Sequence, residues 1–189
     1  MTAHMLYLMR HGAPAVPGRL LGRTDDPATE AGIAACVARV GGIEVERIVA
    51  SDLIRARACA DAIGGYQGFP VEIDPRWREL DFGAWDGLAP AAIDRAALAA
   101  FYEDPDASPP PGGERWSALQ HRVSQALAAM PPVSTLVVTH GGAIRAALAA
   151  LCGFDLRQVW AFDLPCAALV SLRIWPGQTQ TVQIVGLAM

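Results

Sequence analysis

The sequence predicts an α/β fold with a largely parallel β-sheet. Residues 5–9 and 135–139 are short, mostly apolar runs, which are typical of strands that helices cover on both faces. Strand-like and helix-like segments alternate along the chain, as successive units of strand, helix and parallel strand require. A length of 189 residues fits one domain with a sizeable core. We therefore expect a single domain over residues 1–189.

The first predicted elements are separated by clear start and stop signals. The strand at residues 5–9 is followed at 12–28 by a stretch rich in Gly, Pro and Asp, which predicts a long loop. Thr29 is the expected N-cap of a helix that ends at Gly41-Gly42. Residues 47–50 then predict a second short strand.

The middle of the chain is less regular. Ser51 is expected to cap the next helix, which Gly64-Gly65 are expected to end. Residues 71–73 predict a third strand. Residues 75–113 have no sustained hydrophobic period, so we expect irregular chain with short helical pieces, one of them at 90–100.

The last third returns to a regular pattern. A helix is expected at about residues 114–130, because two prolines follow it. The strand at 135–139 leads into a further helix that ends near residue 151. Two C-terminal strands are predicted near 167–174 and 181–185.

Composition excludes several classes of function. The formal net charge is −4, all fifteen basic residues are Arg, and no run of basic residues occurs, so broad nucleic-acid binding is not expected. Four Cys without zinc-finger spacing favour a reduced, cytoplasmic protein. The N-terminus lacks the pattern of a signal peptide, and no segment predicts a transmembrane helix. The oligomeric state is left open by the sequence.

Two predicted strands end in the same kind of motif. The first runs into Arg10-His11-Gly12, and the strand at 135–139 runs into His140-Gly141-Gly142. In open α/β sheets, ligands bind at the carboxyl ends of the strands. The strand at 47–50 delivers Arg55 to the same edge. We therefore expect Arg10, His11, Arg55 and His140 to form a concentrated positive site on an acidic protein, which suits a phosphoryl group.

Each of these residues also has a structural interpretation. A single His at a strand end is more often a hydrogen-bonded structural residue than a catalyst, and a single Arg near a helix start is usually solvated. The joint arrangement of two His, two Arg and adjacent Gly favours a functional site. A metal site is the other functional possibility, but His11 and His140 have no carboxylate at ligand spacing, so we expect no metal.

The motifs resemble those of the histidine phosphatase superfamily, branch 1, which has the phosphoglycerate mutase-like fold. Five blocks match in the expected order: Leu8 to Gly12, Gly22 to Gly32, Ser51 to Ala56, Glu79 to Gly87 and Val138 to Arg145. Together they span nearly the whole chain. The resemblance implies a three-layer α/β/α sandwich with a mostly parallel mixed sheet. Within the superfamily, the short length and residues 82–85 and 111–114 most resemble α-ribazole phosphatase and related small phosphatases.

The sequence departs from the family pattern beside the first motif. Ala13 and Pro14 stand where the family often has an acid and a hydroxyl residue, and Pro17 replaces a common Asn. Arg115 stands where a Ser often follows Gly-Gly-Glu. These differences bear on the substrate more than on the chemistry.

The resemblance implies a metal-independent, cofactor-free phosphomonoesterase that acts through a phosphohistidine. His11 would be the nucleophile, Glu79 the general acid, and Arg10, Arg55 and His140 would hold the phosphoryl oxygens. The implied substrate-binding residues are Arg10, Arg55, His140, Gly141, Arg23 and Thr24. The implied partner is a small phosphorylated metabolite, with α-ribazole 5′-phosphate as one candidate.

Several residues and two other functions stay open. Substrate contact is one interpretation of Arg23, Trp85, Glu114 and Arg115. For Trp85 core packing is supported at least as well, for Glu114 a place at a helix start is slightly favoured, and Arg23 and Arg115 stay open. One alternative function is phosphoglycerate mutase, although residues 88–113, where such enzymes carry a second positive cluster, hold one basic residue and four acidic residues here. The other is a catalytically weak binding or scaffold protein of the same fold.

Overall fold

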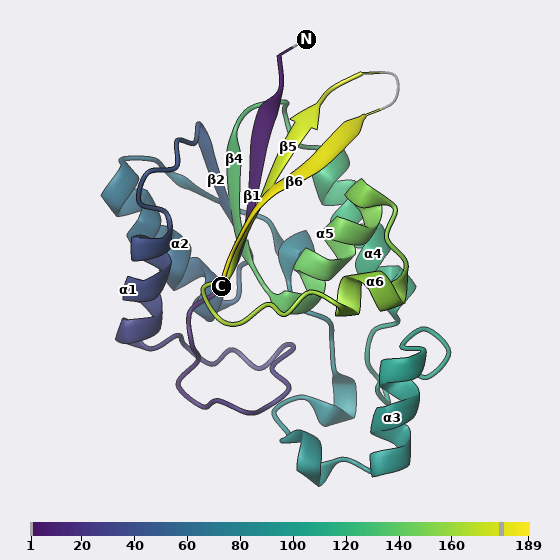
Figure 1. The fold of residues 1–189 in the computed structure, drawn as a ribbon. Helices are drawn as coiled ribbons and strands as arrows, with labels where there is room; N and C mark the ends of the chain where they lie inside the picture. Colours follow the sequence, from purple (N-terminus) through teal and green to yellow (C-terminus); the bar gives the residue numbers. More distant parts are fainter. Residues whose placement is uncertain (1, 178–179) are drawn as a thin grey trace.

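A single mixed sheet is the centre of the molecule (Figure 1). Within residues 2–177 and 180–189, which the computed structural model describes, six strands pair in the order β3-β2-β4-β1-β5-β6. The strands are β1 (His4–Arg10), β2 (Arg47–Ala50), β3 (Val71–Ile73), β4 (Thr135–Thr139), β5 (Leu169–Trp175) and β6 (Thr181–Ala188). Neighbours from β3 to β1 pair parallel, whereas β5 is antiparallel to both β1 and β6. Among these described strands, β5 alone runs against the others.

Helices cover both faces of this sheet (Figure 1). They are α1 (Glu30–Arg39), α2 (Ile54–Gln67), α3 (Arg95–Glu103), α4 (Trp116–Ala128), α5 (Gly141–Cys152) and α6 (Leu156–Trp160). The pair α1 and α2 lies on one face, and α4, α5 and α6 lie on the other. The helix α3 lies beyond the ends of the strands. The predicted three-layer α/β/α sandwich with a mostly parallel mixed sheet is therefore confirmed.

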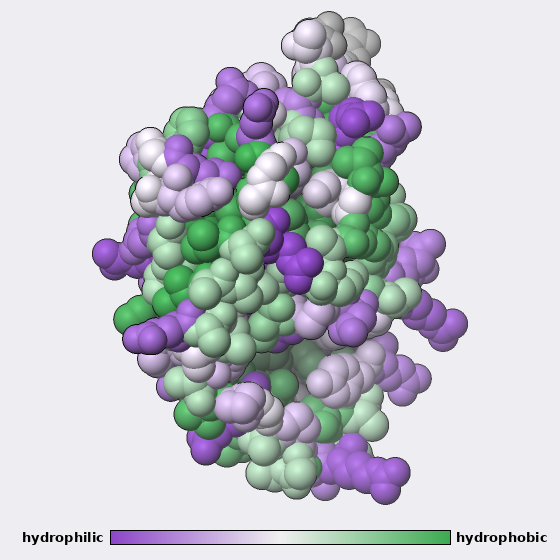
Figure 2. Space-filling model, turned by 60° about the vertical axis from the view of Figure 1, so that its left-hand side comes forward, coloured by the Kyte–Doolittle hydropathy of each residue, from purple (hydrophilic) through white to green (hydrophobic). Residues whose placement is uncertain are grey.

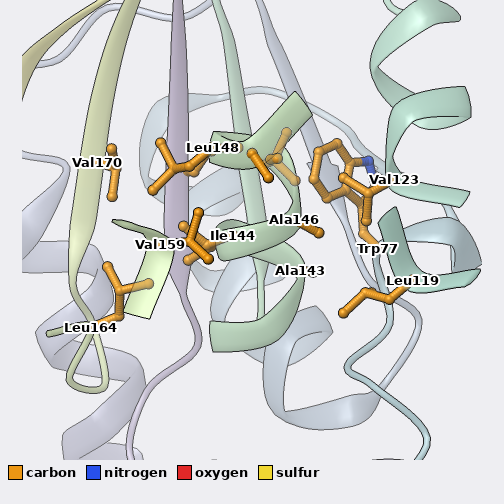
Figure 3. Packing of buried hydrophobic residues seen from close by; sticks show 14 of the residues in the cluster. Trp77, Leu119, Val123, Ala143, Ile144, Ala146, Leu148, Val159, Leu164 and Val170 are labelled. Carbon is orange, nitrogen blue, oxygen red and sulfur yellow. The ribbon is translucent and has the colours of Figure 1, made fainter. Parts of the chain in front are cut away.

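The two central strands feed two separate cores. Alternate residues of β1 point to opposite faces, so Leu6 and Leu8 pack with α4 and α5, whereas Tyr7 and Met9 pack with α1 and α2. On the α4–α5 side, Figure 3 shows Ile144 and Leu148 among the other buried side chains of this core. A strand buried on both faces explains the continuous apolar run at residues 5–9.

The predicted limits of α2 are wrong at both ends. The residue before the helix is Leu53, and Ser51 makes no cap. At the other end the helix passes through Gly64-Gly65 and stops at Gly68, which has a left-handed φ of 75°. The reason lies in the returning chain, because a Cβ on Gly64 would lie 2.7 Å from the Phe69 carbonyl oxygen. Gly64 thus permits close packing and does not end the helix.

Other limits differ by smaller amounts. Thr29 caps α1 as predicted, since its hydroxyl accepts from the Gly32 N–H at 3.0 Å. The helix expected at 114–130 begins at Trp116, and the helical piece at 90–100 is a short 3-10 turn followed by α3. The prediction missed α6, which Asp155 begins with a capping box. Five residues are too few for a periodic signal.

The neighbouring glycines of α2 give a matched test of this packing. We expect Gly64→Ala to lower the free energy of unfolding by about 1–3 kcal/mol, because its methyl group has no room. Gly65→Ala meets no atom within 4 Å and gains helix propensity, so we expect it to raise that free energy by about 0.5–1 kcal/mol. Urea unfolding of both variants measures the difference. Similar changes for the two would contradict the assigned path of α2.

Candidate active site

The two motif histidines meet at the carboxyl ends of adjacent strands. β1 and β4 are paired in register, with Arg10 opposite Thr139, so the residue that follows each strand is a histidine. The His11 N–H donates to the Thr139 carbonyl at 2.9 Å, and the imidazole centroids of His11 and His140 are 5.1 Å apart. Figure 2 shows a hollow in the lower part of the molecule, toward which the carboxyl ends of β1 and β4 point in Figure 1. Sheet register alone therefore brings the rings together.

His11 is a neutral imidazole with one defined free nitrogen. Its ring is buried, and its Nδ1 lies 2.7 Å from the Gly12 carbonyl oxygen. A carbonyl can only accept, so Nδ1 carries the proton and the lone pair lies on Nε2. Burial, and then the positive charge of Arg55, lowers the pKa of His11 to about 3. The free Nε2 is thus available as a nucleophile at neutral pH.

His140 has the complementary arrangement. Its Nε2 lies 2.9 Å from the Ser51 hydroxyl oxygen, whereas its buried Nδ1 has no hydrogen-bond partner among the described residues. Burial, the neighbouring imidazole of His11 and the charge of Arg55 hold the pKa of His140 well below its usual value. When the Ser51 hydroxyl donates to Nε2, the proton of His140 lies on Nδ1 and can be donated to a ligand.

Arg55 is fully buried and fixes a loop. Its two terminal nitrogens donate to three carbonyls at 2.7–2.9 Å, those of Leu21, Gly22 and Thr24. Its Nε has no partner among the described residues. Arg10, at the end of β1, donates to the Leu164 carbonyl, and its buried Nε is likewise without a partner there.

Three donors at the site therefore lack acceptors. They are Arg10 Nε, Arg55 Nε and His140 Nδ1, all buried. Unpartnered buried donors are rare, because each forfeits its hydrogen bonds to water. Neither Arg10 nor Arg55 forms an ion pair within the described part of the chain. An anion with several oxygens, such as a phosphoryl group, would satisfy all three donors and both charges.

Glu79 is held at the start of α5. The Gly142 N–H donates to both carboxylate oxygens of Glu79 at 3.0 and 3.1 Å, and the Leu80 N–H donates to one at 2.8 Å. A Cβ on residue 142 would lie 2.2 Å from a Glu79 oxygen. Only glycine at this position allows the carboxyl group to come so close. Glu79 and His140 are thus anchored to the same helix N-terminus.

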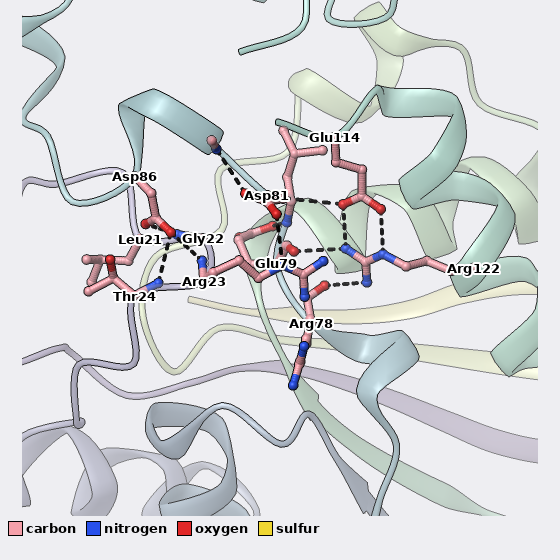
Figure 4. Close-up of polar contacts among 12 residues, drawn as sticks. Leu21, Gly22, Arg23, Thr24, Arg78, Glu79, Asp81, Asp86, Glu114 and Arg122 are labelled. Atoms are coloured by element: carbon pink, nitrogen blue, oxygen red, sulfur yellow. Dashed lines mark hydrogen bonds and ion pairs between the residues drawn. The ribbon is translucent and has the colours of Figure 1, made fainter. Parts of the chain in front are cut away.

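The loop that contains Arg23 and Thr24 is tied to the acidic block (Figure 4). The Asp86 carboxylate accepts from the N–H groups of Gly22, Arg23 and Thr24 at 2.7–2.9 Å. The Arg23 side chain is about one-third exposed and lies 3.4 Å from Asp81. Thr24 uses its carbonyl for Arg55. Their substrate-binding role stays a prediction.

The other residues left open by the sequence have structural contacts. Trp85 is buried and packs edge-on against Phe101. Glu114 is ion-paired with Arg122, and Arg115 donates to the Asp106 carbonyl. Gly141 is buried at the first position of α5.

Sequence reasoning missed three residues of this region. Ser51 was assigned to a helix cap, yet it bonds His140. The sequence indicates Gly142 only as a glycine of the second histidine motif, and its contact with Glu79 crosses 63 residues of sequence. Arg145 lies in the second histidine block, and its guanidinium lies 4.7 Å from the Trp160 ring centre and donates to the Phe162 carbonyl. Only the position of Arg145 in a matched block could have indicated it.

Within residues 2–177 and 180–189, no group of three or more His, Cys, Asp or Glu side chains is arranged to hold a metal ion. No helix there has the length and apolar character needed to cross a membrane.

Comparison with known proteins gives a consistent set of phosphate-handling relatives. The glucosyl-3-phosphoglycerate phosphatase of Mycolicibacterium vanbaalenii is 33% identical over 180 residues, which covers 82% of this chain and 77% of that protein. A solved structure of a mycobacterial glucosyl-3-phosphoglycerate phosphatase superposes with a TM-score of 0.85 at 28% identity, over 97% of this chain and 98% of the other.

Two other relatives carry different names. The adenosylcobalamin/α-ribazole phosphatase of Escherichia coli is 27% identical over 181 residues, with 88% of this chain and 89% of that protein covered. A probable phosphoglycerate mutase of Erwinia tasmaniensis is 32% identical over 162 residues, with coverage of 78% and 74%. The predicted likeness to α-ribazole phosphatase is therefore confirmed, and it is shared with other members.

The family assignment rests on a match that spans most of the chain. The sequence pattern of the histidine phosphatase superfamily (branch 1) matches residues 6–185, which include both histidine motifs, the second arginine block and the acidic block. The chain belongs to branch 1 of the histidine phosphatase superfamily.

Proposed function

We propose that this phosphatase is a phosphomonoesterase that passes a phosphoryl group from a small metabolite to His11 and then to water. The observation that carries the proposal is the set of three unpartnered donors, Arg10 Nε, Arg55 Nε and His140 Nδ1, beside a neutral imidazole. A phosphoryl group has oxygens for each donor, and its phosphorus would face His11 Nε2.

In the first half of the reaction, His11 Nε2 forms a bond to phosphorus with its lone pair. The bond from phosphorus to the ester oxygen breaks, and Glu79 donates a proton to that oxygen. The ring then carries a positive charge, and its Nδ1 keeps its proton and donates it in a hydrogen bond to the Gly12 carbonyl oxygen, 2.7 Å away. That hydrogen bond stabilises the charged ring.

The fixed donors stabilise the negative charge that develops on the transferred group. Arg10, Arg55 and His140 are held by strand ends or by carbonyl contacts before the substrate arrives. Preorganised donors need no reorganisation during the reaction, and one such donor contributes about 3–4 kcal/mol in well-studied enzymes.

In the second half, the Glu79 carboxylate accepts a proton from water as the water oxygen attacks phosphorus. The N–P bond breaks and returns its electron pair to His11 Nε2, and inorganic phosphate leaves. Glu79 ends protonated and His11 neutral, as both began. The cycle balances without a metal or a redox partner, so we propose that the enzyme needs neither.

We propose a small phosphorylated metabolite as the substrate, with α-ribazole 5′-phosphate and glucosyl-3-phosphoglycerate as candidates. Each candidate substrate is taken from the name of a relative, the glucosyl-3-phosphoglycerate phosphatase and the adenosylcobalamin/α-ribazole phosphatase. Hydrolysis is favoured over mutase activity, because residues 88–113 have Arg95 as their one basic residue and carry Asp94, Glu103, Asp104 and Asp106. A second phosphate would be repelled there. A scaffold role is disfavoured, since His11, Glu79 and the donors are all present.

The first prediction tests the proposed function. In EDTA, the purified chain should release phosphate from at least one phosphomonoester among 3-phosphoglycerate, α-ribazole 5′-phosphate and glucosyl-3-phosphoglycerate. His11→Ala should abolish both turnover and acid-labile labelling of the protein by ³²P-substrate. His121→Ala, an exposed histidine of α4, is the matched control and should behave as wild type.

Two results would overturn the proposal. One is activity that EDTA abolishes and a divalent ion restores. The other is 2-phosphoglycerate formation from 3-phosphoglycerate, primed with 2,3-bisphosphoglycerate, that outruns phosphate release by orders of magnitude.

The second prediction concerns acid stability. The folded state holds His11 neutral down to about pH 3, whereas the unfolded chain takes up this proton near pH 6.5. The unfolded state therefore binds more protons in this window. The contribution of His11 to the free energy of unfolding falls by ~1.4 kcal/mol per pH unit as the pH drops through it. Urea unfolding at pH 7.5 and 5.0 should show a smaller acid loss for His11→Gln than for wild type, by roughly 2 kcal/mol. An equal loss would mean that His11 is protonated in the fold.

The third prediction concerns Gly142. An added methyl group must displace the Glu79 carboxyl group, so Gly142→Ala should lower kcat at least about 10-fold, toward the 10²–10⁴-fold that a positioned proton donor supplies. Gly65→Ala, a helical glycine on α2 with open surroundings, is the control. Steady-state kinetics with an alkyl phosphate measure both. Unchanged kcat in Gly142→Ala would remove the basis for the Glu79 contact.

A further inference from the structure

Arg122 is the most heavily bonded side chain near the site, and no catalytic step uses it. It lies on α4 with 16% of its side chain exposed. Its Nη1 donates to the carbonyls of Arg76 and Arg78, both at 2.7 Å, and its Nη2 donates to the carbonyl of Glu79 at 2.8 Å. One guanidinium thus holds three carbonyls in the four residues that end at Glu79.

Glu114 completes this arrangement. Its carboxylate accepts from Arg122 Nε at 2.8 Å and from Arg122 Nη2 at 2.9 Å, and it is 13% exposed. The same carboxylate accepts from the Asp81 N–H at 3.3 Å. Figure 4 shows the pair beside the chain that carries Glu79. The pair therefore braces the backbone on both sides of Glu79.

The braced segment is irregular. Residues 78–82 are neither helix nor strand, so no regular ladder fixes their carbonyls. Leu80 is buried, and the Asp81 carbonyl accepts from the Glu114 N–H at 2.8 Å. The Glu79 side chain bonds Gly142 and Leu80 at its carboxyl end. Among the described residues, Arg122 supplies the hydrogen bond to the Glu79 carbonyl.

The arrangement also fits the charges of the site. Arg122 is near enough to His140 for its charge to help lower the pKa of that imidazole. Glu114 neutralises Arg122 by a two-bond contact, which leaves the free positive field to Arg10 and Arg55. A salt bridge with a purely structural role would need neither the three carbonyl contacts of Arg122 nor a place beside Glu79.

We propose that Arg122, held in place by Glu114, is a positioning residue that sets the place of the Glu79 proton donor against the leaving-group oxygen. The inference rests on the proposed function, since it takes Glu79 as the general acid. It predicts a defect in proton donation only. His11 sits at the end of β1, and Arg122 has no contact with it among the bonds of the described residues.

Leaving groups of different basicity separate this role from a structural one. An alkyl phosphate needs a proton as its ester bond breaks, whereas p-nitrophenyl phosphate hardly does. We expect Arg122→Lys, which has no planar fork to reach all the acceptors, to lower kcat on 3-phosphoglycerate or glycerol phosphate about 30-fold or more. On p-nitrophenyl phosphate we expect less than a 3-fold change, and KM should change little on either substrate.

Two further variants serve as controls. Glu114→Gln keeps the Arg122 carbonyl contacts and loosens the pair, so it should give a weaker loss of the same selective kind, and it tests the proposal if Arg122→Lys fails to fold. Arg57→Gln changes an exposed arginine of α2 whose side chain pairs with Asp61. It should leave both substrates unaffected.

A double variant completes the test. If Arg122 acts through Glu79, adding Arg122→Lys to Glu79→Gln should cost less than 3-fold beyond Glu79→Gln alone. Equal losses on both substrates, or additive losses in the double variant, would overturn the positioning role. If Glu79→Gln itself shows no dependence on the leaving group, the general-acid assignment fails and the inference fails with it. If Glu79→Gln is selective and Arg122→Lys is not, the inference alone fails.

Discussion

The guanidinium groups of Arg55, which is buried, and Arg10, which is partly buried, form no ion pair with the described carboxylates, and the rest of this site depends on that constraint. Burying an unpaired charge costs several kcal/mol, so the fold has to offer compensation. Arg55 obtains it from three carbonyls of the loop at residues 21–24, and Arg10 obtains part of it from Leu164. Arg55 and the Asp86 carboxylate therefore fix the conformation of this loop together. The compensation is incomplete, because dipoles reduce a charge without neutralising it, and this leaves a site suited to a dianion.

The same positive field explains the state of the histidines. A protonated His11 or His140 would add a third charge to the cluster, so burial and the arginines together hold both imidazoles neutral. The Gly12 carbonyl fixes the tautomer of His11, whereas the Ser51 hydroxyl can donate to His140 or accept from it. When Ser51 donates, one ring presents a lone pair and the other an N–H. In the proposed mechanism, nucleophile and donor then differ only in which nitrogen is already occupied.

The sequence predicted the sheet and the cluster well because both follow from strand ends. Continuous apolar runs marked β1 and β4, and the residue after each run was a histidine, so register placed His11 beside His140. The family blocks added Glu79, which no periodicity would have selected. What the sequence did not predict depends on contacts between distant segments. Gly64 looked like a helix stop, and its true role is visible only against the carbonyl of Phe69. Ser51 was expected to be a helix cap because its contact with His140 crosses 89 residues of sequence and is not visible in the local pattern.

The chemistry and the choice of substrate are built from different parts of the fold. The groups around the phosphoryl position stand at the ends of β1 and β4 and at the start of α2 and α5, where regular structure fixes them. We propose that the leaving-group side is formed by the loop at residues 12–28 and the irregular segment 75–113, which are joined by Asp86 and by the Arg23–Asp81 contact. A Cβ on Gly22 would lie 2.5 Å from the Leu80 carbonyl oxygen, so the two segments pack closely there. Loops of this kind tolerate changes such as Ala13, Pro14 and Pro17 without moving strand ends. A phosphoryl site fixed by strand ends, with exchangeable loops beside it, would account for relatives that are 27–33% identical to this chain and carry three different names.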